Sequence, residues 1–196
     1  MFRIEIHDQL EDAPRKQVHG IIQHTWHSEQ LAFGDVTVKP NKDSCAVDRL
    51  DPISTHVLVY SPWGTLAAYG RISILSKIED FELTREELEF CDIELPSAYF
   101  SRLVVHPNFR RHGISKMIHR IRVQIAIQNR CNVIMGSAVG KTAAKILQDM
   151  GFEILRDTRG FRCAWYETTR TTYLMSLRLT NFFVQQFNDS DNRIAN

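Results

Sequence analysis

The spacing of apolar residues along the chain predicts an alternation of strands and helices. Residues 2–7 alternate between apolar and polar side chains, as a half-buried strand does. Residues 14–26 begin with a proline and then place apolar side chains at helical spacing, which predicts an amphipathic first helix. Residues 30–42 show little periodicity, and we expect a loop there.

A hairpin is predicted in the next part of the chain. Residues 55–60 and 65–74 are rich in apolar and β-branched side chains, and Pro62 and Gly64 between them are turn residues. Residues 77–96 then form an insert between strands. Thr84 and Glu87 have the spacing of a capping box, so we expect a short helix that starts at Thr84 and has a solvated acidic face.

The middle of the chain changes its period within a few residues. Residues 99–105 are aromatic and β-branched enough for a buried strand, and Pro107 follows as a stop signal. From Gly113 the apolar residues recur at helical spacing. This face consists of Ile114, Met117, Ile118, Ile121 and Ile125.

The remaining pattern continues as strand (132–137), helix (141–150), a short strand after Gly151 and Phe152, and alternating final strands (163–177). Residues 178–187 have the apolar spacing of a closing helix, and residues 188–196 read as a frayed polar tail. Because no linker divides the chain, we expect residues 1–196 to form one domain of the α/β (α+β) class.

Charge is nearly balanced overall but not locally. The net charge of +1 gives no reason to expect a nucleic-acid-binding protein, whereas residues 79–94 are acidic and residues 101–130 hold seven Lys/Arg and no Asp/Glu. The four cysteines are far apart, which favours reduced thiols in a cytoplasmic protein. We expect no signal peptide and no membrane span, because no apolar run is long enough.

The junction between the central strand and its helix predicts an anion site. The turn 110–115 is basic and contains a glycine, and the helix that follows begins with free amides and the positive end of its dipole. An ordinary turn with solvated arginines is equally compatible with these residues.

The turn also resembles a known family. Arg110-x-x-Gly113-x-Ser115, after a strand ending in Leu-Val-Val-His-Pro, is similar to the acyl-CoA signature of the GNAT N-acyltransferases. The resemblance, which covers roughly residues 55–155, implies the GNAT fold: a mixed central sheet with splayed parallel strands, flanked by helices. It also implies that an acyl-phosphopantetheine thioester is held without a metal, by Val105, Arg110, Arg111, His112, Gly113, Ile114 and Ser115.

A second set of residues narrows the resemblance. Asp48-x-x-Asp51, then Gly70-Arg71, then Ser101-Arg102, look like the N-acylhomoserine lactone synthases and the long-chain N-acyl amino acid synthases. This branch implies acyl carrier protein as donor and substrate contacts at Arg71, Ser101, Arg102 and Ser137. One ion-pair network of Asp48, Asp51, Arg71 and Arg102 is the structural alternative.

The sequence departs from this branch at two positions. Ala46 and Tyr99 stand where the lactone synthases usually carry glutamate, which argues against a lactone synthase more than against the branch. Leu147 occupies the place of the tyrosine that protonates the leaving thiolate in many acetyl-transferring relatives.

Acyl transfer requires an exposed thioester carbonyl, a neutral amine and stabilisation of the oxyanion. In the GNAT fold a strand amide does the last, so the main chain at Leu103 and Val104 is the candidate. Tyr99, Asp48 or a bound water are candidates for the base.

Two other motifs are weaker. Residues 136–142 look like a phosphate-binding P-loop but have one residue too few between the glycines. His24 and His27 could share a helix face, but no further metal ligands have suitable spacing, so structural histidines are favoured.

The sequence therefore predicts an N-acyltransferase that moves a medium or long acyl chain from acyl carrier protein to a small amine such as an amino acid. An acetyl-CoA-dependent N-acetyltransferase and a non-catalytic GNAT-like binding module are the alternatives.

Overall fold

The strands of the protein form one mixed sheet, in a computed structural model that describes residues 1–33, 36–38, 49–162 and 166–180. The eight strands have the order β1-β3-β4-β5-β6-β8-β2, and β7 also pairs with β8. Only the β5–β6 pair is parallel among these described strand pairs. The strands are β1 (Arg3–His7), β2 (Val36–Val38), β3 (Ser54–Tyr60), β4 (Leu66–Leu75), β5 (Ser97–Val105), β6 (Val133–Val139), β7 (Glu153–Arg162) and β8 (Tyr166–Arg178).

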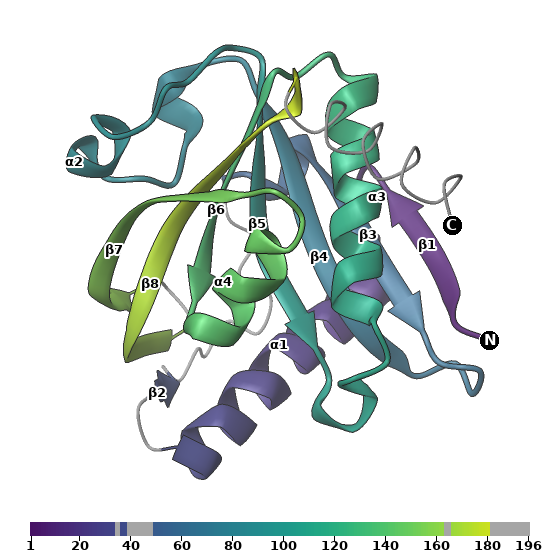
Figure 1. Ribbon diagram of the computed structural model, residues 1–196. Coiled ribbons are helices and arrows are strands. Elements are labelled where there is room, and N and C mark those ends of the chain that lie inside the picture. The colour runs from purple at the N-terminus through teal and green to yellow at the C-terminus, as the bar shows by residue number, and fades with distance from the viewer. Residues whose placement is uncertain (34–35, 39–48, 163–165, 181–196) are drawn as a thin grey trace, which may run out of the picture.

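Helices cover both faces of this sheet (Figure 1). They are α1 (Asp12–Phe33), α2 (Arg85–Leu88), α3 (Ile114–Gln128) and α4 (Lys141–Gln148), with short 3-10 turns at Asp51–Ile53, Ile78–Asp80 and Pro107–Phe109. Residues of β3 alternate between the two layers: Leu58 and Tyr60 pack in the cluster with α1, whereas Val57 and Val59 pack in the cluster with α3. The two helices therefore lie on opposite faces.

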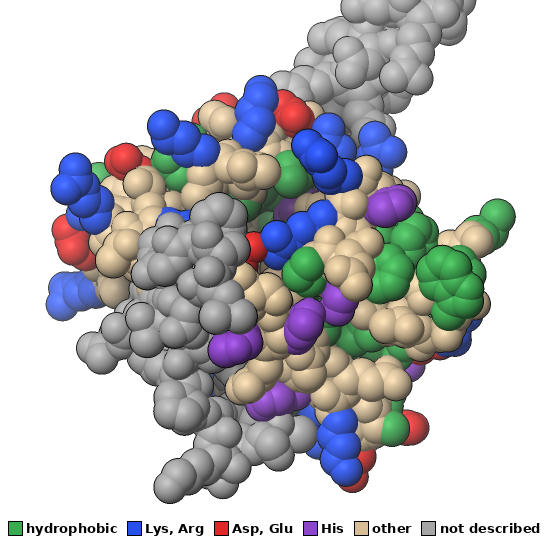
Figure 2. All heavy atoms as spheres, turned by 90° about the horizontal axis from the view of Figure 1, so that it is seen from below, with side chains coloured by type: hydrophobic (Ala, Val, Ile, Leu, Met, Phe, Trp, Pro, Cys, Tyr) green, Lys and Arg blue, Asp and Glu red, His purple; other side chains and the backbone are tan. Residues whose placement is uncertain are grey.

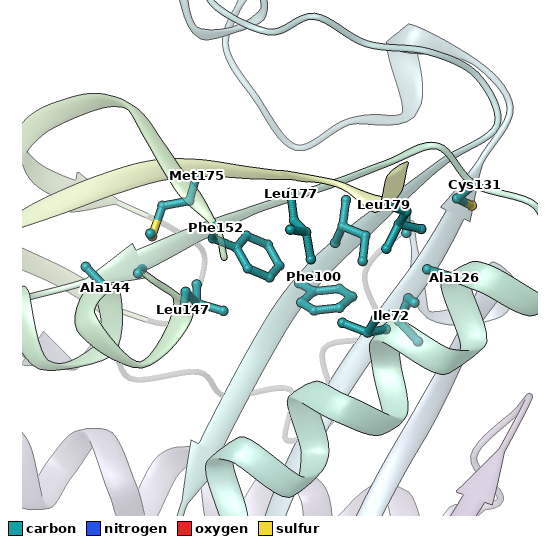
Figure 3. Close-up of a cluster of buried hydrophobic side chains, with 14 residues drawn as sticks. Ile72, Phe100, Ala126, Cys131, Ala144, Leu147, Phe152, Met175, Leu177 and Leu179 are labelled. Atoms are coloured by element: carbon teal, nitrogen blue, oxygen red, sulfur yellow. The ribbon is translucent and has the colours of Figure 1, made fainter. Parts of the chain in front are cut away.

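A third group of buried side chains joins α3 and α4 to the other half of the sheet (Figure 3). Phe100 of β5 lies at its centre, with Phe152 at a ring distance of 5.8 Å. Leu147 of α4 and Leu177 of β8 complete the contacts around these rings. Because β5 contributes to all the clusters, it is the strand about which both faces are organised.

The insert between β4 and β5 packs on the sheet. Phe81 is buried against Tyr99 of β5, at a ring distance of 5.7 Å. The predicted capping box is confirmed: the Thr84 hydroxyl accepts from the Glu87 amide, and the Glu87 carboxylate accepts from the Thr84 amide. Of the acidic residues of α2, Glu86 is exposed and Glu87 is half-buried.

Most sequence-predicted elements are confirmed, with one clear error. The expected loop at residues 30–42 is wrong, because α1 continues to Phe33 and β2 follows at Val36–Val38. A strand of three residues is too short to show a period, and its partner in β8 is far away in the sequence. Of the predicted closing helix, Arg178 instead ends β8, and Leu179 and Thr180 are helical; residues 181–187, like the tail 188–196, lie outside the described residues.

Two expectations concern features of the whole chain. Among the described helices, none has the length and apolar character needed to cross a membrane. Cys91 and Cys131 are free thiols, and burial raises the pKa of each to about 11. Cys45 and Cys163 lie outside the described residues.

Candidate functional site

The parallel strands β5 and β6 separate after a short paired stretch. Ala98–Phe100 of β5 pairs with Ile134–Gly136 of β6, and the described residues beyond these positions do not continue the pairing. A Cβ on Gly136 would lie 3.2 Å from the Phe100 Cβ and carbonyl oxygen, so the glycine permits the close approach at the last paired position. Beyond it, the β5 backbone from Ser101 to Val105 is not paired with β6. The Ser101 carbonyl accepts from Arg122 and the Val105 carbonyl from Arg110, which leaves the main chain between them to a ligand.

A bulge in β5 accompanies this separation. Tyr69 of β4 pairs with Val104 and Arg71 pairs with Ser101, so Gly70 alone faces two residues of β5. The first of these, Arg102, has a φ of +52°, in the left-handed region that is unfavourable for a residue with a side chain. The His106 amide donates to the Ala67 carbonyl of β4, so by the alternation of an antiparallel ladder the Val104 amide also faces β4. Of the two predicted oxyanion donors, Leu103 is therefore the one whose amide is turned away from β4.

The turn before α3 is open at the predicted anion site. Gly113 precedes the helix with a φ of +73°, and a Cβ there would meet no atom within 4 Å. The first helical bond runs from the Met117 amide to the Gly113 carbonyl at 3.1 Å, so the amides of Ile114 and Ser115 point out of the helix end. Backbone N–H groups and the helix dipole together favour an anion here.

The side chains of this turn are directed away from the helix end. His112 folds back on the loop through Nδ1, which lies 2.8 Å from the Arg110 carbonyl oxygen. Arg110 donates from Nη2 to Glu29 of α1 at 2.7 Å. Arg111 is exposed and has a φ of +66°. The backbone of the turn and the exposed Arg111 are thus what the helix end offers to an anion, whereas Arg110 is held by Glu29.

Glu29 was not singled out from the sequence. Its carboxylate, 12 % exposed, also accepts from Arg170 of β8 at 2.9 Å, so it joins the turn before α3 to the strand beyond β6. The nearby His24 and His106 rings stack at 4.7 Å. Histidine side chains gather on this lower face of the molecule (Figure 2). No sequence signal marked Glu29, because its partners come from distant parts of the chain.

The polar residues on the α1 face of the sheet form the ion-pair network that was one of the two sequence interpretations. Arg71 is fully buried and pairs with Asp51 at 2.7 Å and with Glu82 at 3.3 Å. Its Nε donates to the Ser101 hydroxyl at 2.9 Å, and Arg102 lies 3.4 Å from Asp51. The buried arginine fixes the segment before β3 and the insert to β4 and β5. Asp48 lies outside the described residues.

Two histidines border this network. His56 contacts the Tyr69 hydroxyl at 2.9 Å through Nδ1, and burial is the main cause of its lowered pKa. The pKa of His19 on α1 is lowered by burial and by the charge of Arg102. Both rings are therefore mainly neutral at pH 7. Neither was a sequence-predicted site residue.

The other predicted site residues lie in the core or beyond the point where β5 and β6 separate. Tyr99 is buried beside Phe81 among apolar side chains, and Ser137 lies on β6 opposite Leu174 of β8, beyond the last residue paired with β5. Leu147 is 4 % exposed and packs in the core (Figure 3). Among the described residues, no group of three or more His, Cys, Asp or Glu side chains could hold a metal ion.

Comparison of the sequence with known protein families and with curated proteins finds no match. Comparison of the structure with solved structures does find similar folds. The N-acyl amino acid synthase FeeM from uncultured soil microbes has a TM-score of 0.68 at 10 % identity, over 93 % of this chain and 92 % of that one. The protein has the GNAT fold.

Acetyltransferases share the same fold. The spermidine N-acetyltransferase of Vibrio cholerae, solved with CoA and spermine, has a TM-score of 0.60 at 11 % identity, covering 92 % of this chain and 98 % of that one. The ribosomal-protein-S18-alanine N-acetyltransferase of Escherichia coli has a TM-score of 0.56 at 13 % identity, covering 91 % of this chain and 94 % of that one. At such identities the likeness establishes the fold, including the splayed parallel strands that the sequence predicted.

Proposed function

We propose that the protein is an N-acyltransferase that moves an acyl group from a pantetheine thioester to the amine of a small acceptor. The separation of β5 from β6, next to the open turn at Gly113, is the observation that carries this proposal. A pantetheine arm needs unpaired strand backbone along its length, and its phosphate needs free amides at its end. Both features occur here, within one strand–turn–helix unit.

The main chain supplies most of the proposed chemistry. The amides of Ile114 and Ser115 hold the phosphate, and the unpaired edge of β5 holds the pantetheine arm. The amide of Leu103 then donates to the thioester oxygen, where negative charge develops, because the Val104 amide is taken up by the ladder with β4. Positions on a strand and a helix end are rigid, so the donors are aligned before the reaction.

The transfer itself balances without a cofactor. The lone pair of the neutral amine attacks the carbonyl carbon, a C–N bond forms, and the carbonyl electrons move to oxygen. Collapse of this intermediate breaks the C–S bond, and the thiolate leaves with the electron pair. The surplus proton on nitrogen passes through water to the thiolate, because Leu147 offers no acid and Tyr99 is buried among apolar side chains.

The charges around α1 favour an acceptor that carries an anionic group, such as an amino acid. A polyamine would need carboxylates that are not already neutralised. In the two ion-pair groups on this side of the sheet, three described carboxylates are held by four arginines. These ion pairs join Asp51, Glu82 and Glu29 to Arg71, Arg102, Arg110 and Arg170.

Acyl carrier protein is the proposed donor because exposed cations lie near the donor turn. Arg111 and Arg120 are exposed, and Arg130 is exposed at the far end of α3. An acidic carrier protein would be attracted by this surface, whereas coenzyme A alone requires only the turn. Of the seven Lys/Arg between residues 101 and 130, Arg122 is buried and does not belong to this surface.

The proposal is tested by incubating the purified protein with one donor and a mixture of amines. The donors are acetyl-CoA, a long-chain acyl-CoA and the matching long-chain acyl carrier protein; the amines are the protein amino acids and two polyamines. Mass spectrometry then identifies N-acylated products. We expect N-acyl amino acids from the acyl carrier protein.

Products from acetyl-CoA alone would assign the protein to the acetyltransferases and remove the carrier-protein part. Polyamine products would contradict the acceptor assignment. Absence of any product, together with no binding of CoA or pantetheine in calorimetry, would overturn the whole proposal.

A further inference from the structure

A second buried arginine lies on the face of the sheet opposite to Arg71. Arg122 of α3 is 1 % exposed and belongs to the helix stripe that packs against the sheet. Burial of a guanidinium is costly unless its donors and its charge are compensated. Its contacts therefore indicate what the residue does.

The guanidinium of Arg122 spans the bulge between β4 and β5. Its Nη1 donates to the Arg71 carbonyl of β4 at 3.0 Å and to the Ser101 carbonyl of β5 at 3.3 Å. These residues form the last strand pair before the register shift. The bulge interrupts the hydrogen bonding between β4 and β5, and the Arg122 side chain connects the two strands in its place.

The glycine of the bulge makes room for this contact. A Cβ on Gly70 would lie 2.7 Å from Ile118 Cγ2, 3.3 Å from Leu103 Cδ1 and 3.7 Å from Arg122 Cζ. Helix α3 can press onto β4 only because Gly70 has no side chain. The same distances show that the side chains of Arg122 and Leu103 both lie close to Gly70 of β4.

The remaining contacts of Arg122 are uncharged. Its Nη2 lies 2.7 Å from His119 Nδ1, and its Cζ lies 4.1 Å from the centre of the Phe100 ring. The pKa of His119 is well below its ordinary value, so the ring is neutral and accepts this hydrogen bond. No described carboxylate forms an ion pair with Arg122 within 4 Å. Burial lowers the pKa of Arg122 to about 9, which still leaves it protonated at neutral pH.

We propose that Arg122 is a positioning residue for acyl transfer: it holds the β5 bulge that aims the Leu103 amide, and its uncompensated charge stabilises the oxyanion and the departing thiolate. The inference rests on the proposed function. A buried positive charge behind the oxyanion donors acts in a medium of low dielectric, where it is weakly screened. A purely structural residue at this place could be apolar.

The test compares Arg122→Met, Arg122→Lys and His119→Leu. The lysine variant keeps the charge but cannot reach both carbonyls. His119→Leu is the matched control, because it also removes a buried polar contact on α3 but leaves Arg122 on the two carbonyls. We expect kcat to fall about 10²-fold in Arg122→Met, by less in Arg122→Lys, and by less than about 3-fold in His119→Leu, with the donor KM nearly unchanged in all three.

Backbone hydrogen exchange gives a readout that does not depend on activity. Peptides covering 97–105 are expected to exchange faster in both Arg122 variants than in His119→Leu. If Arg122→Met does not fold, Arg122→Lys carries both measurements. Equal losses of kcat in the lysine and control variants, or unchanged exchange of the strand, would overturn the inference.

The two proposals can fail separately. A wild-type protein that turns over no thioester donor contradicts the proposed function, whereas the exchange measurement still reports whether Arg122 holds the bulge. A wild-type protein that is active, with variants that keep its kcat, contradicts only the role of Arg122.

Discussion

Single residues at the β5 bulge determine how closely α3 approaches the sheet. Gly70 is the point of contact, because any side chain there would collide with Ile118. Arg122 then fills the opening with a side chain whose Nη1 donates to two carbonyls at once, one on each strand. A glycine and a buried arginine, both unusual inside a packed layer, are explained by the same strand irregularity.

The substitution Gly70→Ala is expected to lower the free energy of unfolding by about 1–3 kcal/mol, because the added methyl forces α3 away from β4. Gly20→Ala is the control, since a Cβ at Gly20 in α1 would meet nothing within 4 Å. That change should stabilise the protein by about 0.5–1 kcal/mol through helix propensity. Urea unfolding of both variants measures the difference, and equal effects would show that the packing at Gly70 is not tight.

His119 should make stability depend on pH. Burial, and then the charge of Arg122, lower the pKa of His119 well below 6.5. The folded protein keeps the ring neutral while the unfolded chain takes up a proton near pH 6.5, so stability falls as the pH drops below that value and is constant above it. Between about pH 7.5 and about pH 5.5 both proteins lose unfolding free energy. This loss should be smaller in His119→Leu than in the wild type, by about 1.4 kcal/mol. An identical pH dependence would show that the ring titrates normally.

At the scale of elements, the strand–turn–helix unit β5–α3 combines both requirements of a thioester site. β5 leaves its parallel neighbour after Phe100, and α3 begins at a glycine with open space around it. The strand exposes backbone because of the bulge, and the helix exposes backbone because every helix does so at its first turn. Neither element needs a specialised side chain to hold the donor.

The substitution Gly113→Val is expected to raise the donor KM at least about 10-fold, because the side chain would occupy the space for the phosphate and disfavour the backbone conformation. Gly64→Val is the matched control. Gly64 has a φ of +79°, close to the +73° of Gly113, and a Cβ there also meets nothing within 4 Å, but it lies in the β3–β4 turn. Similar loss of stability in both variants, with loss of donor binding only in Gly113→Val, is the expected result. Steady-state kinetics and calorimetry with CoA measure donor binding in the two variants. Equal donor KM values would contradict the assignment of the turn to the donor phosphate.

At the scale of the whole molecule, charge is separated although the total is nearly neutral. The acidic insert is held through Arg71, Arg156 and Arg178, which pair with Glu82, Glu86 and Glu94. The basic side chains of the donor turn and α3 instead lie mostly exposed. Such a surface favours fast, salt-dependent encounter with an acidic partner.

The substitution Arg120→Glu is therefore expected to raise the KM for acyl carrier protein about 5–10-fold and to leave the KM for acyl-CoA unchanged. Lys77→Glu, an equal change of charge at an exposed position of the insert, should leave both values unchanged. Kinetics at low and high salt check the origin of the effect, since added salt should reduce the difference between the wild type and Arg120→Glu. Equal effects on the two donors would argue against carrier-protein docking at α3.

The sequence by itself determined the features that depend on neighbours in the chain. The hairpin turn, the capping box at Thr84, the helix from Ile114 and the glycine turn before it all follow from residues within a few positions of one another. The buried state of Arg122 was also accessible, because Ile114, Ile118, Arg122 and Ala126 follow one another at intervals of four on one helix face. The predicted apolar face did not include Arg122, although a charged residue within such a stripe can be recognised from the sequence.

Only the tertiary structure decided which distant segments meet. The pairing of β2 with β8, the position of Glu29 between Arg110 and Arg170, and the bulge opposite Gly70 each join residues that are far apart in the sequence. A local pattern fixes the period of an element but not its neighbour, since strand pairing and ion pairs form across the sheet. The proposed oxyanion donor, the turn and the buried arginine therefore come together only when β4, β5 and α3 are packed against one another.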